Sequence, residues 1–187
     1  MYFIGVDIGG TGIQAGIVNN DGKILFKKEC ITRVNESFKT VMDDINNLVR
    51  SLLSENNIHI EEIKSIGFGV PGFINKKGLT TCVNLGWKEV NFIEEIKNIF
   101  PEVSVFAEND ATVAAVAEAK FGSMKNKDIA VMYTLGTGVG GGIIINGTGV
   151  ISDGNSVISL DKEETVYIKE GVNYNIEGNL ELIKSYV

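Results

Sequence analysis

The sequence has no long hydrophobic run and no cluster of basic residues. No apolar stretch approaches the roughly 20 residues that cross a bilayer, and the N-terminus lacks the basic region of a signal peptide. Lys and Arg number 17 against 24 Asp and Glu, which gives a formal net charge of −7. Broad nucleic-acid binding needs a basic surface that neutralises phosphates, whereas backbone N–H groups can bind a single phosphate without one. We therefore expect neither a membrane nor a nucleic acid as partner.

Cysteine and histidine are nearly absent. The two cysteines are Cys30 and Cys82, and no C-x-x-C motif occurs, so nothing in their spacing suggests a disulfide. A reducing cytoplasm is the simpler interpretation. The single histidine, His59, lies in a charged stretch and is expected at the surface. The P-loop signature G-x-x-x-x-G-K-[ST] is also missing, which excludes that route to a nucleotide.

Two glycine-rich segments are present and nearly identical. The first reads GTGIQAGIV from Gly10, and the second reads GTGVGGGII from Gly136, 126 residues later with no gap. The second also fits the dinucleotide pattern G-x-G-x-x-G, which requires a helix after the loop. The β-branched residues at 143–145 predict a strand there instead. We therefore expect two strand–loop–strand hairpins whose turn N–H groups bind phosphate; a Rossmann oxidoreductase would need a helix after Gly142.

Hydrophobic periodicity predicts an α/β chain with an internal repeat. After residue 122 the opening strand–loop–strand pattern starts again, so we expect one domain at 1–122 and the beginning of a second at 123–187. A turn at 19–22 predicts that the first strands are antiparallel, and residues 73–87 are rich in loops. The expected strands cover 2–7, 13–18, 23–30, 65–70, 103–107, 129–135, 143–146, 157–160 and 165–169; the expected helices cover 35–57, 91–100, 110–121 and 179–186.

Two features of these elements predict packing rather than chemistry. The long helix carries an apolar stripe, and Asn35 or Ser37 could cap its start. Trp87, the single tryptophan, is expected to pack in the core rather than to stack on a ligand. The stripe comprises Phe38, Val41, Met42, Ile45, Leu48, Val49, Leu52 and Leu53.

Two carboxylates stand at the ends of predicted strands. Asp7 precedes the first glycine loop, where it could hold a hydrated Mg²⁺ beside bound phosphates or cap its own turn. Asp110 opens a helix and, taken alone, is best interpreted as an N-cap. Beside two phosphate loops, however, a carboxylate at the end of a strand can accept the proton of a hydroxyl nucleophile.

Five ordered motifs resemble the ROK (repressor, open reading frame, kinase) family of the actin–Hsp70–hexokinase superfamily. This family includes bacterial glucokinases, fructokinases and N-acetyl-sugar kinases. The resemblance covers residues 2–149 and implies a ribonuclease-H-like (actin-like ATPase) mixed sheet with flanking helices. The motifs are VDIGGT at 6–11, GVPG at 69–72, NLGW at 84–87, ENDA at 108–111 and LGTGVGGG at 135–142.

The resemblance also implies a role for individual residues in the ATP-dependent phosphorylation of a hexose such as glucose, a reaction of cytoplasmic carbohydrate metabolism and glycolysis. Asp110 would be the general base and would also bind the sugar, together with Asn109, Gly72 and Asn84. Asp7 would act on Mg²⁺ and the phosphates. The residues implied to line the ATP phosphates are Gly9, Gly10, Thr11, Gly136, Thr137 and Gly138.

The sequence departs from the family after the second glycine loop. Neither histidine nor cysteine follows Cys82, so the family's Glu-x-Gly-His segment and its zinc motif do not occur in this chain. Most of the second domain, through which family members often dimerise, is absent as well. We therefore expect little or no kinase activity from the 187 residues. The alternative is a non-catalytic sugar- or nucleotide-binding module, or a fragment that needs a partner chain; without an N-terminal helix-turn-helix, a repressor is not expected.

Overall fold

A computed structural model describes residues 1–34, 36–75, 78–135, 139–145, 148–152 and 157–159. The chain divides into two compact units, residues 1–113 and 114–187. The predicted boundary at residue 122 stays a prediction. Several predictions lie outside the described residues: the elements at 165–169 and 179–186, the cap at Asn35, and the phosphate contacts of Gly136, Thr137 and Gly138.

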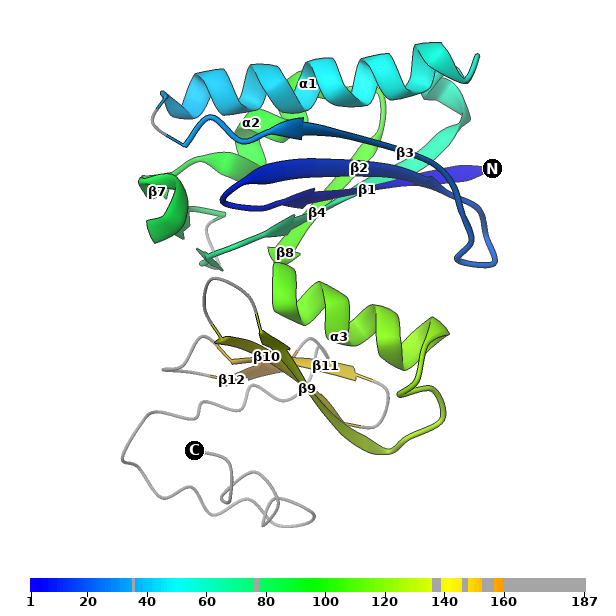
Figure 1. Cartoon of the computed structure of the whole chain (residues 1–187), viewed down its shortest axis with the longest axis vertical. Coiled ribbons are helices and arrows are strands. Elements are labelled where there is room, and N and C mark those ends of the chain that lie inside the picture. The colour runs from blue at the N-terminus through cyan, green and yellow to red at the C-terminus, as the bar shows by residue number, and fades with distance from the viewer. Residues whose placement is uncertain (35, 76–77, 136–138, 146–147, 153–156, 160–187) are drawn as a thin grey trace. The chain divides into compact units, whose positions relative to one another are not determined.

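The first unit is built on a five-stranded mixed sheet (Figure 1). The first three strands are antiparallel neighbours, as the turn at 19–22 predicts, while β4 and β8 join β1 in parallel. Parallel pairing requires a crossover, and helices supply both crossovers here. In sheet order the strands are β3 (Ile24–Ile31), β2 (Gly12–Val18), β1 (Tyr2–Ile8), β4 (Ile63–Val70) and β8 (Ser104–Asn109).

Two helices, α1 (Phe38–Glu55) and α2 (Phe92–Ile99), cover one face of this sheet, as Figure 1 shows. Ser37 caps α1, since its side chain accepts a hydrogen bond from Thr40 N. The predicted stripe of α1 is confirmed, because all of its members except the half-buried Phe38 are buried. Burying such side chains stabilises the fold by about 1.5–3 kcal/mol each. The core therefore lies between the helices and the sheet.

The strands expose one face and bury the other. In β1, Ile4, Val6 and Ile8 are at most 2% exposed, whereas the alternate residues Gly5 and Asp7 are exposed. Successive side chains of a strand point to opposite faces, so this alternation places Asp7 on the face away from α1 and α2. The carboxylate thus stays outside the apolar core.

The loop-rich stretch contains a small antiparallel sheet that the sequence did not predict. Its strands are too short to show a period, and the turn η2 (Val83–Leu85) joins two of them. Trp87 is buried between Phe92, on which it stacks, and Phe38, which it meets edge-on, so its predicted packing role is confirmed. The strands are β5 (Phe73–Ile74), β6 (Thr80–Cys82) and β7 (Trp87–Val90).

A short turn and a helix complete the connections. The turn η1 (Ile60–Glu62) follows the exposed His59, whose surface position is confirmed, and leads into β4. The helix α3 (Asp110–Phe121) begins in the first unit and ends in the second. Its acidic first residue and its basic Lys120 both suit the helix dipole.

The second unit contains an antiparallel sheet in which the residues after the second glycine loop form a strand. This arrangement confirms the predicted hairpin, and the Rossmann alternative is wrong because Ile143–Ile145, which would have to begin a helix, belong to a strand paired with β9. The strand β11 was not predicted. The sheet order is β12 (Val157–Ser159), β11 (Thr148–Ser152), β10 (Val139–Ile145) and β9 (Ile129–Leu135).

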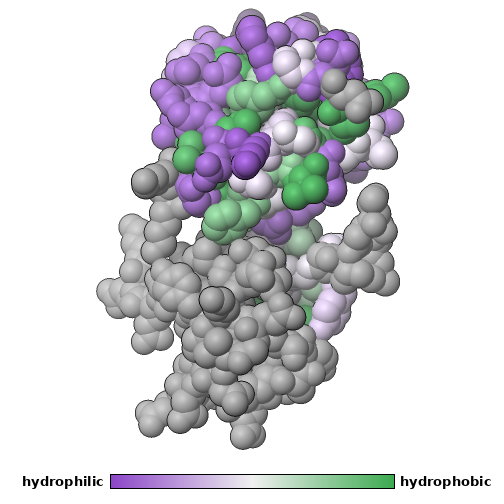
Figure 2. Space-filling view, turned by 90° about the vertical axis from the view of Figure 1, so that its left-hand side faces the viewer, coloured by the Kyte–Doolittle hydropathy of each residue, from purple (hydrophilic) through white to green (hydrophobic). Residues whose placement is uncertain are grey.

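The visible surface of the first unit is mostly hydrophilic, with smaller hydrophobic areas between the polar ones (Figure 2). Among the described residues, no helix is long and apolar enough to cross a membrane. Four of the exposed large hydrophobic side chains lie on the edge strand β3, namely those of Ile24, Leu25, Phe26 and Ile31.

Candidate active site

The candidate site lies where three parallel strands end. Asp7 of β1 pairs with Gly69 of β4, and Gly69 pairs with Glu108 of β8. The carboxyl ends of β1, β4 and β8 therefore lie side by side, and Asp110 follows the last of them. A Cβ atom built on Gly69 would lie 3.6 Å from Asp7 Oδ1 and 3.7 Å from Asp110 Cβ. Gly69 thus stands between the two carboxylates that the sequence singled out.

The environment disfavours a negative charge on Asp7. Its side chain is open to solvent on one side, but protein atoms crowd the other, and this desolvation is the main cause that raises its pKa. The negative charge of Asp110 raises the pKa further. Repulsion between two neighbouring carboxylates is relieved when a cation binds between or beside them. The pair therefore has the electrostatics of a cation site.

Asp110 is the first residue of α3, yet the capping bond belongs to Asn109. Asn109 Oδ1 accepts a hydrogen bond from Thr112 N at 3.1 Å, three residues further, which is the N-cap geometry. Asp110 Oδ1 accepts a hydrogen bond from Ala111 N at 2.7 Å, while Oδ2 has no hydrogen-bond partner among the described residues. The cap that the sequence offered to Asp110 is therefore made by its neighbour, which leaves one carboxylate oxygen of Asp110 available.

Asn109 also joins α3 to the turn after β4. Its Nδ2 donates a hydrogen bond to Gly72 O at 3.2 Å. The backbone N–H of Asn109 donates to Glu108 Oε1 at 2.7 Å, and burial raises the pKa of that glutamate. Asn109 thus uses both ends of its amide within the protein, with one N–H of the Nδ2 group left over for a ligand.

Gly72 is fixed by close packing. A Cβ there would lie 2.3 Å from Thr81 O and 3.0 Å from Cys82 Cα, so β6 leaves no room for a side chain. The thiol of Cys82 donates to Pro71 O at 2.8 Å, and burial raises the pKa of Cys82 to about 11. The turn at Pro71 and Gly72 is therefore held by β6 on one side and by Asn109 on the other.

The first glycine loop is closed by its own backbone and by one threonine. Gly9 N donates to Gly12 O at 2.9 Å, and a Cβ on Gly9 would approach the same oxygen to 2.9 Å. Thr32 Oγ1 donates to Gly9 O at 2.7 Å, and Thr32 N donates to Thr11 O at 3.2 Å. Sequence reasoning missed Thr32, because no local signal connects it with a loop more than twenty residues earlier.

Asn84 lies beside the glycine loop. It belongs to η2 and is exposed, and its Cβ lies 3.9 Å from a Cβ built on Gly10. The first unit therefore brings together every predicted site residue that the structure describes. These residues are Asp7, Gly9, Gly10, Thr11, Gly72, Asn84, Asn109 and Asp110.

The residues present fit Mg²⁺ better than a metal held entirely by protein. Within the described ranges, no three His, Cys, Asp or Glu side chains group closely enough to hold a metal. Mg²⁺ prefers oxygen ligands, keeps several waters, and is usually bound through one or two carboxylates together with substrate phosphates. Asp7, with its raised pKa and its carboxylate neighbour, offers that kind of site.

The mixed sheet, with its carboxylates at the strand ends beside a glycine hairpin, defines the class of protein: it is the actin-like ATPase fold. The ROK family glucokinase from Streptomyces griseus in complex with glucose and AMPPNP has a TM-score of 0.71 and 32% identity over 80% of this chain and 46% of that one. The inorganic polyphosphate/ATP-glucomannokinase from Arthrobacter sp. strain KM has a TM-score of 0.72 and 27% identity over 81% of this chain and 61% of that one.

The ROK family model matches residues 3–156, and the chain belongs to the ROK family. A glucokinase from Streptomyces coelicolor is 36% identical over 144 residues, which are 76% of this chain and 43% of that protein. The chain spans less than half the length of the glucokinases that it matches. The family resemblance inferred from the five motifs is thereby confirmed.

Proposed function

We propose that this chain carries the sugar-side and the first phosphate-side residues of an ATP-dependent hexose kinase. The observation that supports this most strongly is the meeting of Asp7 and Asp110 around Gly69, at the carboxyl ends of three parallel strands. Several relatives are named as glucokinases or sugar kinases, and these names agree with phosphorylation of a sugar.

Asp110 acts as the general base in this proposal. Its unpartnered Oδ2 accepts the proton of the sugar hydroxyl while that oxygen attacks the terminal phosphorus of ATP. The bond from the sugar oxygen to phosphorus forms, the bond from phosphorus to the bridging oxygen breaks, and ADP leaves. The hydrogen bond that Ala111 N donates to Asp110 Oδ1 holds the carboxylate in place during the transfer.

Asn109 and Gly72 position the sugar in this proposal, because the hydrogen bond between them ties the sugar-side turn to the base. Asn84, which belongs to η2 and lies beside the glycine loop, would lie at the border between the sugar and the phosphates. Glucose is the proposed substrate on the strength of the relatives' names, with related hexoses as the comparison in any assay.

Asp7 holds Mg²⁺ indirectly, through water, and the loop at Gly9, Gly10 and Thr11 contacts the phosphates. Bound Mg²⁺ supplies charge neutralisation for the phosphates. Three points stay predictions. They are a second phosphate contact through Gly136, Thr137 and Gly138, a place in cytoplasmic glycolysis, and assembly as a homodimer. A non-catalytic sugar- or nucleotide-binding module, or a fragment that needs a partner chain, is the second candidate, and the assay below distinguishes it from the kinase.

A single-turnover assay tests the proposal on the 187-residue protein. The protein is held in excess over glucose, mannose or N-acetylglucosamine, with Mg²⁺ and ATP labelled on its terminal phosphate; polyphosphate serves as the comparison donor. We expect slow formation of a sugar phosphate from ATP. The Asp110→Asn variant should be slower by about 10²–10⁴-fold, with the glucose dissociation constant unchanged by calorimetry.

The matched control is Glu61→Gln, which removes an exposed carboxylate from η1 and should leave the rate unchanged. Equal rates in Asp110→Asn and the unaltered protein would remove Asp110 as the base. Glucose binding with no turnover at all would favour the non-catalytic module. A rate of about 1–100 s⁻¹, as ordinary kinases show, would contradict the expected weak activity of this chain.

A further inference from the structure

Thr32 makes two hydrogen bonds to the first glycine loop, and both go to carbonyl oxygens. Its hydroxyl donates to Gly9 O at 2.7 Å, and its N–H donates to Thr11 O at 3.2 Å. Thr32 is 5% exposed, which makes it one of three buried polar residues among the described part of the chain. A buried hydroxyl costs free energy unless it is bonded, so breaking this contact is unfavourable.

Fixing these carbonyls also fixes two N–H groups. Every described peptide bond is trans, so the N–H of each peptide unit points away from the C=O of the same unit. Gly9 C=O points to Thr32, and the N–H of Gly10 therefore points away from it. The same holds for Thr11 C=O and the N–H of Gly12. Turn N–H groups that point outward form a concave site for an anion.

We propose that Thr32 is a positioning residue for ATP: it aims the N–H groups of the first glycine loop at the phosphates. This inference rests on the proposed function. The last strand pair is Gly12 and Ile31, and the bond from Thr32 N to Thr11 O continues that register by one step. The hydroxyl bond to Gly9 O is the contact that leaves the ladder and reaches the loop. Ending the strand does not require a buried hydroxyl that donates to Gly9 O.

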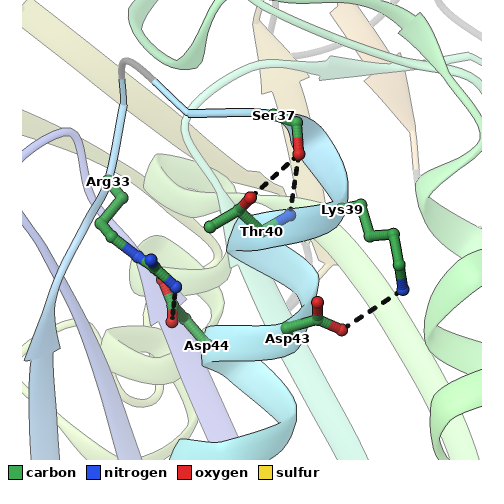
Figure 3. A network of polar contacts seen from close by, with 6 residues as sticks. All are labelled: Arg33, Ser37, Lys39, Thr40, Asp43 and Asp44. Carbon is green, nitrogen blue, oxygen red and sulfur yellow. Dashed lines mark hydrogen bonds and ion pairs between the residues drawn. The ribbon is translucent and has the colours of Figure 1, made fainter.

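The segment that follows Thr32 is itself anchored to α1, as Figure 3 shows. Arg33 donates from Nε to Asp44 Oδ2 at 2.8 Å and from Nη2 to Asp44 Oδ1 at 2.5 Å. This two-point contact fixes direction as well as distance. The hydroxyls of Ser37 and Thr40 meet at 2.9 Å one turn away. The threonine therefore extends from a braced connection rather than from a free loop.

The first experiment measures the loop without any ligand. Thr32→Val keeps the shape of the side chain and removes the hydroxyl, whereas Thr32→Ser keeps the hydroxyl; Thr32→Ala is a second removal should the valine variant fold poorly. We expect ¹⁵N relaxation order parameters at Gly10 and Gly12 near about 0.85 in the unaltered protein and in Thr32→Ser, and below about 0.6 in Thr32→Val. Thr40→Val, which loses only the contact with Ser37, should leave both glycines rigid.

The second experiment measures binding of ATP with Mg²⁺ by calorimetry. The dissociation constant should rise about tenfold in Thr32→Val, the factor that about 1.4 kcal/mol corresponds to, and return towards the original in Thr32→Ser. The dissociation constant for glucose should not change. A merely structural role would weaken both ligands together and would not be rescued selectively by serine.

Each outcome decides something. Unchanged order parameters at Gly10 and Gly12 in Thr32→Val and Thr32→Ala would overturn the inference, whatever ATP does. Lower order parameters with an unaltered ATP affinity would overturn the role in phosphate binding. Lower order parameters in a protein that binds no ATP in any variant would leave Thr32 as the residue that positions the loop and would contradict the proposed kinase function instead.

Discussion

The two glycine hairpins share a sequence but differ in register. In the first, Ile8 pairs with Ile13, which leaves four residues in the turn. In the second, Leu135 pairs with Val139, which leaves three. Leu135 lies 126 residues after Gly9, so a position that must be glycine in one hairpin is a paired leucine in the other. A sequence repeat without a gap therefore does not guarantee the same turn.

The carboxylate is not repeated either. The residue 126 positions after Asp7 is Tyr133, an exposed side chain on β9. Only the first hairpin combines a glycine turn with an acidic residue whose pKa is raised by its surroundings. The comparison teaches that the two hairpins share the strand–loop–strand pattern, while their register and the acidic residue differ. Three changes of decreasing expected effect would break or sharpen this difference.

The largest effect is expected from adding one methyl group to the first turn. In Gly9→Ala the new Cβ would approach Gly12 O, a backbone atom that cannot easily move, to 2.9 Å. We expect the free energy of unfolding to fall by about 1–3 kcal/mol, as overpacking generally costs. Urea titration measures the loss.

Gly141→Ala is the comparison change in the second hairpin: it adds the same methyl group to a strand position, where the first hairpin already has Ala15. Its Cβ would lie 3.2 Å from Met132 O, a tighter contact than usual but not a clash. The gain of about 0.5–1 kcal/mol from replacing glycine in a strand should offset most of that cost. A loss equal to that of Gly9→Ala would show that the strand position Gly141 is as tightly constrained as the turn position Gly9.

The next effect concerns Asp7 and should be stabilising. Because its pKa is raised in the folded state, the folded protein holds this proton more tightly than the unfolded chain does. Stability therefore falls as pH rises from the ordinary pKa of 3.8 through the raised value. Asp7→Asn should have a higher Tm than the unaltered protein at neutral pH, and the difference should vanish in acid. Differential scanning calorimetry from pH 3 to 8 measures it.

Adding Mg²⁺ distinguishes the stability that the charge of Asp7 costs from the part that Asp7 has in binding the metal. Adding Mg²⁺ with ATP should raise the Tm of the unaltered protein and raise that of Asp7→Asn less, since the variant has lost the carboxylate. Asp43→Asn, an exposed change on α1, should respond as the unaltered protein does. A lower neutral-pH Tm in Asp7→Asn would mean that its charge stabilises the fold.

The smallest effect is expected from the ion pair between Arg33 and Asp44, which anchors the segment after β3 to α1. Asp44→Asn removes the ion pair with Arg33, an exposed partner, so we expect a small decrease in Tm. High salt screens exposed charges, and the difference from the unaltered protein should shrink in 1 M NaCl. Thermal melts at low and high salt measure this, and a salt-independent decrease would point to lost packing instead.

The sequence predicted the parts of the fold that repeat regularly. The stripe of α1 and the alternation in β1 are long periodic signals, and each places its apolar residues in the core. The strands β5, β6 and β7 contain two to four residues each, too few to show a period, so the sequence pattern predicts only a loop-rich stretch there. These strands are positioned by tertiary packing, such as the close contact of Gly72 with Thr81, and no local sequence pattern indicates that packing.

The sequence predicted the site residues whose position along the chain marks them, and it did not predict those that are placed by contacts with distant parts of the chain. Asp7 and Asp110 could be found because each follows a strand. The capping bond was assigned to Asp110, when considered alone, because aspartate and asparagine cap equally well; the choice of Asn109 depends on its bond to Gly72. Thr32 carried no signal at all, since its partners lie on another strand connection.

Trp87 has a practical consequence for every measurement proposed above. It is the single tryptophan of the chain, and it lies in the first unit between Phe38 and Phe92. Its fluorescence therefore changes when that unit opens, whereas far-ultraviolet circular dichroism follows the strands and helices of both units. Recording both signals in one urea titration compares the unfolding of the first unit with that of the whole chain. Coincident curves mean one cooperative transition, and separate curves mean that the two units unfold at different urea concentrations.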